Sequence, residues 1–189
     1  MLGIGAGSRS TMPVGPPTVS GPTTTGGFGD GVKRRSQIQM SPAETQSLLS
    51  EARTMTMCTF NHDGTIHAVA MWYGFLGDDI AIETKAKSQK AVNLRRDPRI
   101  TCLVESGEGY NELRGVELVG WAELIEEPAR LWEIGVSVFE RHVAPYNEGQ
   151  HRSQVEAMLH NRVGVRVHAN RIVTWDHRKL GAPPAGRAQ

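Results

Sequence analysis

The chain has 189 residues, of which 39% are hydrophobic and 22% are charged, so it is long enough for one modest globular domain and too short for two large ones. Its 21 Lys and Arg residues nearly balance its 20 Asp and Glu residues, which argues against a dedicated nucleic-acid-binding protein. No apolar run approaches the roughly 20 residues of a membrane helix, so we expect a cytoplasmic protein with no membrane partner.

The first 36 residues differ in composition from the rest of the chain. They contain 9 Gly and 4 Pro among Ser and Thr, and such a segment cannot bury enough apolar surface to offset its ordering entropy. We therefore expect a disordered tail over residues 1–36, a folded domain over residues 37–180 and a flexible terminus over residues 181–189. Met12 and Met40 are alternative candidate start residues, so the tail is either part of the protein or an artefact of start-site assignment.

The ordered part begins with a capping box. Ser41 stands directly before a proline and three residues before Glu44, a pattern that starts a helix, which we expect to run to about residue 52. Two extended segments follow at residues 54–60 and 65–75, joined by the turn sequence Asn-His-Asp-Gly. These segments predict a β-hairpin.

The rest of the domain alternates strands and helices. Apolar periodicity and turn residues predict strands at residues 80–84, 99–105, 113–125 and 163–175, and helices at residues 88–96, 128–141 and 148–160. Interior glycines in the long strand at residues 113–125 indicate a bend or a bulge. Six mostly antiparallel strands in a domain of this size favour closure into a small barrel, because closure removes exposed edges. The sequence therefore predicts a mainly β fold with flanking helices.

The loop between the third strand and the short helix carries the strongest chemical signal. Ser88 stands at the expected N-terminus of the helix, where unpaired N–H groups and the helix dipole favour an anion. Lys85, Lys87 and Lys90 add positive charge, and Thr84 adds a second hydroxyl. These residues predict a phosphate site. The alternative is a solvated, lysine-rich turn in which Ser88 serves only as the helix cap.

From residue 41 to residue 176 the sequence resembles the pyridoxamine 5'-phosphate oxidase-like split-barrel superfamily. Residues 90–99, Lys-Ala-Val-Asn-Leu-Arg-Arg-Asp-Pro-Arg, resemble that family's run of a basic residue, Asn-Leu and Asp-Pro-Arg. The resemblance is strongest to the flavin and deazaflavin oxidoreductase branch that is common in actinobacteria. It implies a six-stranded antiparallel split β-barrel, and a homodimer with its cofactor sites at the subunit interface.

The resemblance also assigns cofactor-binding residues. It implies that one strand lies along the cofactor ring and ribityl chain, that hydroxyl and basic side chains hold the phosphate, and that a tryptophan of the partner chain completes the pocket. These residues are His67, Val69, Ala70, Met71 and Trp72 on the strand, Thr84, Lys85, Lys87, Ser88 and Lys90 at the phosphate, and Trp175.

Departures from the family pattern narrow the expected reaction. His67 and Trp72 stand where pyridoxamine phosphate oxidases carry an arginine and a lysine, and the C-terminus lacks their Arg-x-His arrangement, so oxidation of vitamin B6 is disfavoured. The basic loop resembles that of the deazaflavin branch, which holds both the phosphate and the acidic glutamyl tail of coenzyme F-420. We therefore favour this cofactor over FMN, and expect hydride transfer to a small conjugated substrate.

Several alternatives stay open at this point. Trp72, Tyr73 and Trp175 are either walls of the substrate pocket or core and interface aromatics. No catalytic residue is identified, and a proton for the product comes either from solvent or from His67. The alternative function is a protein that binds or carries a flavin, a deazaflavin or haem without turnover, and a third is a barrel that has lost its cofactor and serves as an interaction module.

The sequence offers no metal site. His142, His151 and His160 recur every nine residues, and this spacing places successive members on opposite faces of a helix. Cys58 and Cys102 lack the paired spacing of a disulfide framework or a thiolate zinc site, so we expect both to be reduced core residues.

Overall fold

Residues 35–181 are described by the structure, which is a computed structural model. The predicted disordered tail and flexible C-terminus lie outside the described residues, except for residues 35, 36 and 181. The elements, in chain order, are α2 (Pro42–Glu51), β1 (Thr54–Phe60), β2 (Ile66–Trp72), β3 (Gly74–Leu76), β4 (Asp79–Lys85), α3 (Gln89–Arg96), β5 (Arg99–Ser106), β6 (Arg114–Ile125), α4 (Pro128–His142), α5 (Glu148–Leu159), β7 (Arg162–Asp176) and the short 3-10 helix η1 (His177–Leu180).

The capping box at the start of α2 is confirmed. The Ser41 side chain accepts a hydrogen bond from the Glu44 N–H, and the Glu44 carboxylate accepts one from the Ser41 N–H. The hairpin turn is also present, with the Asn61 and Thr65 backbones bonded across it. Local turn and cap chemistry therefore places these element ends.

The strand expected at residues 65–75 is two strands, which makes seven strands rather than six. β2 pairs with β1, whereas β3 pairs with β4, so the chain crosses from one side of the sheet to the other at Tyr73. The Tyr73 ring is fully buried, and its hydroxyl donates to the Leu49 carbonyl at 2.7 Å. This core contact fixes the point at which the strand breaks.

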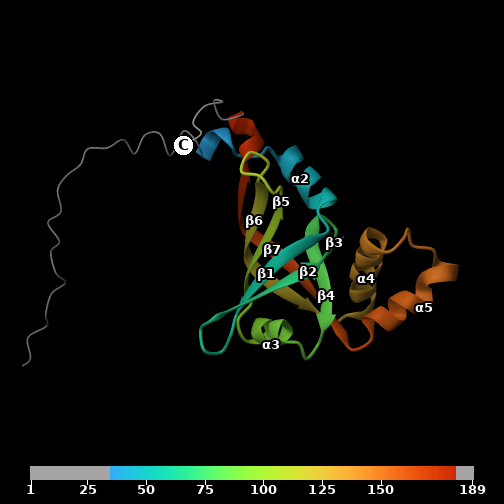
Figure 1. Ribbon diagram of the computed structural model, residues 1–189. Coiled ribbons are helices and arrows are strands. Elements are labelled where there is room, and N and C mark those ends of the chain that lie inside the picture. The colour runs from blue at the N-terminus through green and yellow to red at the C-terminus, as the bar shows by residue number, and fades with distance from the viewer. Residues whose placement is uncertain (1–34, 182–189) are drawn as a thin grey trace, which may run out of the picture.

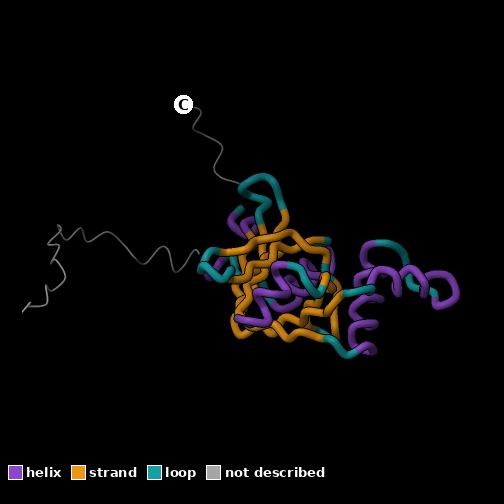
Figure 2. Tube along the Cα trace, turned by 90° about the horizontal axis from the view of Figure 1, so that it is seen from below, coloured by secondary structure: helices purple, strands orange, loops and turns teal. Residues whose placement is uncertain are grey.

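The strand order forces the sheet to close on itself. The seven strands form one antiparallel sheet in the order β2-β1-β5-β6-β7-β4-β3. Its two edge strands, β2 and β3, are consecutive in the chain with only Tyr73 between them. Edges joined by one residue must lie together, and Figure 2 shows the strands as a ring. The predicted mainly β split barrel with flanking helices is confirmed.

Helices close the barrel at both ends and cover one side. α2 and α3 lie at opposite ends of the barrel, while α4 and α5 project from its side (Figure 1). α4 packs on β3 and β4, where the Ser137 hydroxyl accepts a hydrogen bond from the Phe75 N–H at 2.8 Å. The barrel interior is filled by buried apolar side chains, among them Met55, Met57, Ile82, Val104, Val116 and Val165.

The expected irregularity in the long strand is a β-bulge. Val119 lies opposite Arg171 and Gly120 lies opposite Ala169, so Asn170 is an extra residue in β7. A Cβ atom at Gly120 would come within 1.9 Å of the His168 carbonyl oxygen, so this close approach requires glycine. Because of the extra residue, the side chains of Ala169 and Ile172 both point to the inner face of the barrel.

One arginine ties α2 to the sheet. The Arg141 guanidinium donates to the carbonyls of Leu49 at 3.1 Å, Ala52 at 2.7 Å and Ser50 at 3.2 Å, which belong to the C-terminal turn of α2. It also donates to the Tyr73 carbonyl at 3.1 Å. The last carbonyls of a helix have no intrahelical donors, so Arg141 satisfies groups that would otherwise lack partners.

We predict that Arg141→Ala lowers the free energy of unfolding by about 3 kcal/mol, because several half-buried carbonyls lose their donor together. Arg141→Lys is expected to restore less than half of the loss, since a single ammonium cannot span the same acceptors. Urea denaturation measures both values. The control is Arg152→Ala in exposed ion pairs on α5, with an expected loss below about 1 kcal/mol. Equal losses for the two alanine variants would contradict the role of Arg141.

Candidate functional site

The helix α3 connects two parts of the barrel wall. The Asn93 side chain is fully buried and donates to Thr59 Oγ1 at 3.1 Å and to Asn61 Oδ1 at 3.0 Å, so α3 is bonded to the β1–β2 hairpin. At its N-terminus, Ser88 Oγ lies 3.2 Å from Thr84 Oγ1 at the end of β4. The first turn of α3 is therefore held at the end of the barrel where β4 ends and β2 begins.

The first turn of α3 presents hydrogen-bond donors that an anion can use. The Ser88 side chain caps the helix by accepting from the Ala91 N–H at 3.4 Å. The N–H groups of Gln89 and Lys90 have no intrahelical acceptor, because the first intrahelical bond runs from the Val92 N–H to the Ser88 carbonyl. The hydrogen bond between the Thr84 and Ser88 hydroxyls uses the proton of one of them. The proton of the other hydroxyl is left for another acceptor. The residues predicted for the phosphate therefore lie together with suitable chemistry.

The three predicted lysines differ in their surroundings. Lys85 and Lys87 are exposed, whereas Lys90 is partly buried on α3. Burial lowers the pKa of Lys90, the positive charge of Arg162 lowers it further, and the negative charge of Glu83 opposes both effects. The site thus holds one partly desolvated ammonium and two solvated ones.

An ion pair lies behind this loop. Glu83 on β4 is buried and bonded to the guanidinium of Arg162 at the start of β7. Burial raises the pKa of the Glu83 carboxyl, and the nearby charge of Arg162 opposes the rise. With Glu83 ionised, Glu83, Arg162 and Lys90 together carry one net positive charge next to the first turn of α3.

The loop itself is fixed by contacts from distant segments. The Ala86 N–H donates to the Asn161 carbonyl at 3.0 Å, and the Ala86 carbonyl accepts from the Arg95 guanidinium at 2.6 Å. Asn161 has a φ of 57°, a left-handed conformation in which asparagine is tolerated better than most residues. The loop conformation therefore depends on the start of β7 as well as on its own sequence.

The predicted cofactor strand is β2, an edge strand of the sheet. His67, Val69 and Met71 lie opposite inward-facing residues of β1 and are half-buried, whereas Ala70 and Trp72 are exposed on the outer face. As an edge strand, β2 has one row of backbone groups without a strand partner among the described residues. A ligand that lay along this edge would meet backbone groups rather than one face of side chains.

Trp175 lies far from the predicted phosphate residues within one chain. β7 pairs with β4 through Val163 opposite Thr84, and Trp175 follows Val163 by 12 residues, roughly 40 Å along an extended strand. Its indole lies over Gly115, where a Cβ atom would come within 2.2 Å of the ring. The structure thus places Trp175 at the far end of β7, on the outer face of the sheet.

The two remaining candidate aromatics have different roles. Tyr73 is a core residue and not a pocket wall, because it is fully buried and its hydroxyl is bonded to Leu49. Trp72 is 56% exposed and stacks on His142, with 4.5 Å between the ring centroids and 5° between the planes. Burial lowers the pKa of His142, so its imidazole is neutral at neutral pH.

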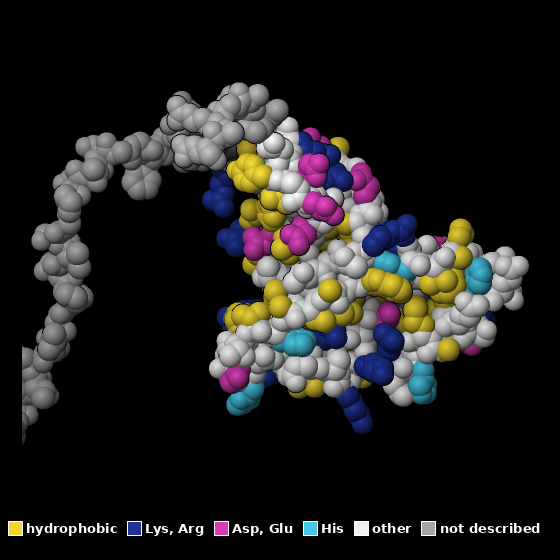
Figure 3. All heavy atoms as spheres, viewed as in Figure 1, with side chains coloured by type: hydrophobic (Ala, Val, Ile, Leu, Met, Phe, Trp, Pro, Cys, Tyr) yellow, Lys and Arg dark blue, Asp and Glu magenta, His cyan; other side chains and the backbone are white. Residues whose placement is uncertain are grey.

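The outer face of the sheet is hollowed and largely apolar. A cavity of about 590 Å³ lies over β1, β5, β6 and β7, and one of about 250 Å³ lies beside it. Cys58 lines both cavities. The larger is also lined by Leu103, Val173 and Trp175, and the smaller by Ile66 and Val119. Figure 3 shows hydrophobic side chains gathered in a band where β1 and β2 face the viewer. Glu117, Thr56 and Thr101 also line the larger cavity, so the face combines apolar and polar side chains, as protein interfaces and ligand sites do.

Cys102 is confirmed as a buried core residue, whereas Cys58 is only partly buried and lines the cavities on the outer face. Burial raises the pKa of Cys102 to about 12 and also raises that of Cys58, so both are protonated at neutral pH.

Within residues 35–181, no three His, Cys, Asp or Glu side chains lie close enough together to hold a metal ion. In the same part of the chain, no helix is both long and apolar enough to cross a membrane.

Comparison with known proteins identifies the family. The family model for pyridoxamine 5'-phosphate oxidase matches residues 41–176, which is nearly the whole described domain. The chain belongs to this family. No curated protein matches the sequence.

Solved structures of this fold agree with the assignment. A conserved hypothetical protein of Mycobacterium tuberculosis is 48% identical, with a TM-score of 0.77, over 82% of this chain and 97% of that one. An F420 reductase is 22% identical with a TM-score of 0.54, over 70% of this chain and 98% of that one. A heme storage protein of Vibrio cholerae is 14% identical with a TM-score of 0.57, over 71% and 96% of the two chains. At these low identities, the last two show a shared fold only.

The sequence did not identify three residues that support the loop before α3. Glu83 and Arg162 form the ion pair behind the loop, and Asn161 supplies the carbonyl that holds Ala86. Glu83 is adjacent to the recognised Thr84, and a charged residue within an otherwise apolar strand was a usable signal. The other two lie at the start of β7, nearly 80 residues away in sequence, with nothing local to connect them to the loop.

We predict that Arg162→Ala lowers the free energy of unfolding by about 3 kcal/mol at pH 7, because Glu83 then ionises without its partner. Burial already raises the folded-state pKa of Glu83 above its ordinary value of 4.5, and the variant raises it further. The loss is therefore small below about pH 4.5 and grows as the pH rises through the folded pKa. Urea denaturation at several pH values tests this dependence.

The control for this prediction is the double variant Arg162→Ala/Glu83→Gln, which carries no ionisable group at either position. The loss in its free energy of unfolding, relative to the unchanged protein, should vary less with pH than the loss in Arg162→Ala. A pH-independent deficit in Arg162→Ala would contradict the buried, paired state of Glu83.

Proposed function

We propose that the protein is an oxidoreductase that binds coenzyme F-420, with FMN as the alternative cofactor, and transfers a hydride to a small conjugated substrate. The observation that carries the proposal is the arrangement of Thr84, Ser88 and Lys90 around the first turn of α3, beside the edge strand β2. Hydroxyl, backbone N–H and ammonium donors converge there, as recognition of a phosphate requires.

The described residues fit such a phosphate. The free hydroxyl proton of the Thr84 and Ser88 pair and the N–H groups of Gln89 and Lys90 supply neutral donors. The Lys90 ammonium supplies charge, and its partial desolvation strengthens an interaction with an anion. An anion bound there would also offset the repulsion between Lys90 and Arg162.

The exposed lysines support coenzyme F-420 over FMN. Lys85 and Lys87 form no ion pair within the described part of the chain and stand outside the donor set at Ser88. They therefore carry more positive charge than a single phosphate needs. A cofactor with further carboxylates beyond its phosphate, as in the glutamyl tail of coenzyme F-420, would use that charge.

The protein's own contribution to the chemistry would be binding and orientation. When bound, the cofactor supplies the hydride. The free backbone edge of β2 would hold its ring, while small Ala70 leaves room on the outer face. His67 faces inward opposite Thr59, away from the outer face where we expect the substrate. We therefore assign protonation of the product to solvent.

A second copy of the chain would complete the pocket. The apolar side chains on the outer face of the sheet need a cover, and Trp175 stands on that face at the end of β7 away from Thr84. A twofold dimer through this face would bring Trp175 of one protomer toward the β2 edge of the other. Both observations support a homodimer with two cofactor sites at its interface.

We predict that coenzyme F-420 binds the purified, cofactor-stripped protein more tightly than FMN. The variant Ser88→Ala/Lys90→Ala should lose at least about tenfold in affinity, because it removes a hydroxyl donor and a partly desolvated charge. Quenching of cofactor fluorescence measures both constants. Thermal unfolding checks that the variant is folded, since loss of the Ser88 cap alone costs about 1 kcal/mol.

The matched control is Arg152→Ala/Ser153→Ala, which removes one basic side chain and one serine hydroxyl from exposed positions on α5. It should bind both cofactors unchanged. Equal losses in the two double variants, or no loss in either, would contradict the proposed phosphate site. Tight cofactor binding without reduction of any conjugated acceptor would instead favour the alternative function, a binding or carrier protein.

The dimer generates a separate prediction. Leu103→Asp places a charge in the middle of the outer face and should convert the dimer to a monomer in light scattering. Val143→Asp makes the same kind of change at a 59% exposed apolar residue after α4, and should remain dimeric. A dimer that survives Leu103→Asp would place the subunit interface elsewhere.

A further inference from the structure

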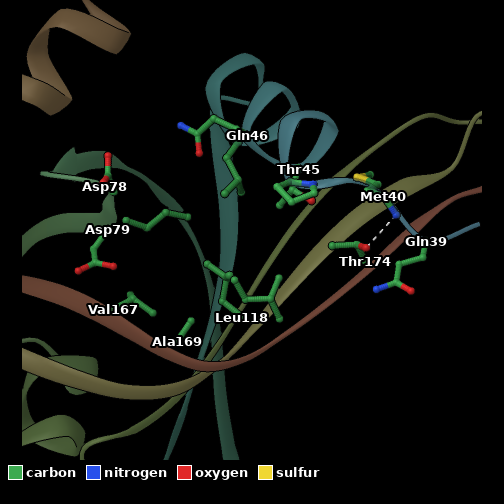
Figure 4. Close-up of a pocket in the computed structure, with 14 residues that line it drawn as sticks. Gln39, Met40, Thr45, Gln46, Asp78, Asp79, Leu118, Val167, Ala169 and Thr174 are labelled. Atoms are coloured by element: carbon green, nitrogen blue, oxygen red, sulfur yellow. Dashed lines mark hydrogen bonds between the residues drawn. The ribbon is translucent and has the colours of Figure 1, made fainter.

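A third cavity lies under α2. It has a volume of about 430 Å³ and separates α2 from the inner faces of β6 and β7 (Figure 4). Its floor includes Leu118, Val167 and Ile80, which are core-type residues of the sheet, and Leu49 contributes from α2. The cavity opens to solvent, with polar side chains around an apolar floor. The volume falls within the roughly 300–1,000 Å³ of small-molecule sites.

Polar contacts hold the N-terminal end of α2 in place. The Met40 N–H donates to Thr174 Oγ1 at 3.0 Å, a contact visible in Figure 4. The Lys179 ammonium reaches the Glu44 carboxylate at 2.7 Å and the Gln39 carbonyl at 2.8 Å. These contacts attach the start of the helix to the end of β7 and to the turn that follows it.

The C-terminal end of α2 is held separately. The Tyr73 hydroxyl and the Arg141 guanidinium both donate to the Leu49 carbonyl, at 2.7 Å and 3.1 Å. With both ends bonded, α2 cannot settle into the hollow without breaking buried or half-buried hydrogen bonds. The cavity is therefore built into the fold.

The sheet also opens at this place. β7 pairs with β4 only as far as Arg166, opposite Ala81, and then continues along β6 alone. The bulge at Asn170 puts both Ala169 and Ile172 on the inner face, and both line the cavity. Ile172 is 54% exposed although it faces inward, so a bound molecule would cover an apolar side chain that is now open to solvent.

The charge around the cavity is negative. Asp78 and Asp79 are the charged residues that line it, and the remaining polar lining residues are Gln39, Thr45, Gln46 and Thr174. Asp79 is paired with Arg166 at 2.6 Å, whereas Asp78 is exposed and has no ion-pair partner within residues 35–181. An apolar cavity beside an unneutralised carboxylate favours a ligand with an N–H donor or a positive charge and disfavours an anion.

We propose that this cavity binds a small organic amine with an apolar ring system, at a site separate from the proposed cofactor site. None of the residues predicted to bind the cofactor lines it. The apolar rings would contact the floor formed by Leu118 and Val167, and the amine would face Asp78.

The test uses two fluorescent probes that differ in one group. N-phenyl-1-naphthylamine is an uncharged aromatic amine, and 8-anilinonaphthalene-1-sulfonate is the same molecule with an added sulfonate. We expect saturable binding of the amine to the full chain, and at least about tenfold weaker binding of the sulfonate. Asp78→Asn should raise the affinity of the sulfonate about threefold, since it removes the opposing charge. Equal binding of both probes, unchanged in Asp78→Asn, would overturn the assigned ligand class.

Two matched substitutions on β7 locate the site. Ala169→Phe points inward and fills the cavity under α2, whereas Val173→Phe points outward and fills the cavity on the outer face. The amine should bind Ala169→Phe about tenfold more weakly and Val173→Phe unchanged. Equal weakening in both, loss only in Val173→Phe, or no binding to the unchanged protein would each refute the proposal. If Ala169→Phe does not fold, Thr45→Trp fills the same space from α2.

Discussion

The one-residue step at Tyr73 determines the rest of this architecture. It joins the two edge strands of a single sheet, β2 and β3, so the sheet must close. No hydrogen-bonded pairing joins β2 to β3, or to β4 with which β3 pairs. The barrel wall is therefore split at this place, and α3 is tied to both sides of the split through Asn93 and Ser88. Because Tyr73 also bonds Leu49 in α2, the same residue positions the helix at the opposite end.

Closure of this kind separates the two proposed sites, whose surroundings have opposite charge. At the α3 end, Lys90 and Arg162 lie near a helix N-terminus, and the lowered pKa of Lys90 reflects both burial and the repulsion between them. At the α2 end, Asp78 stands beside an apolar cavity. An anionic group would be favoured at the α3 end and disfavoured at the α2 end, and a positively charged amine the reverse. The two proposed sites would therefore discriminate between ligands by charge as well as by shape.

The sequence predicted the elements that depend on local chemistry. The capping box at Ser41, the hairpin turn after Phe60 and the cap at Ser88 set boundaries to within a residue, because each uses side chains adjacent in the chain. The proximity of Thr84 and Ser88 at the start of α3 was predictable for the same reason, since they are four residues apart in the chain. The break at Tyr73 was not, since it depends on a contact with Leu49, and neither was the role of Arg162, which reaches Glu83 only through strand pairing. The cavity under α2 has no local signal, because distant side chains hold the helix.

The central claim is that the first turn of α3 holds the phosphate of the cofactor. A crystal structure of the full chain with bound coenzyme F-420 tests it most directly. We predict phosphate oxygens within hydrogen-bonding distance of Ser88 Oγ and of the Gln89 and Lys90 N–H groups, with the ring along β2 and Trp175 of the partner subunit near it. A phosphate bound away from α3, or a cofactor lodged in the cavity under α2, would contradict the account.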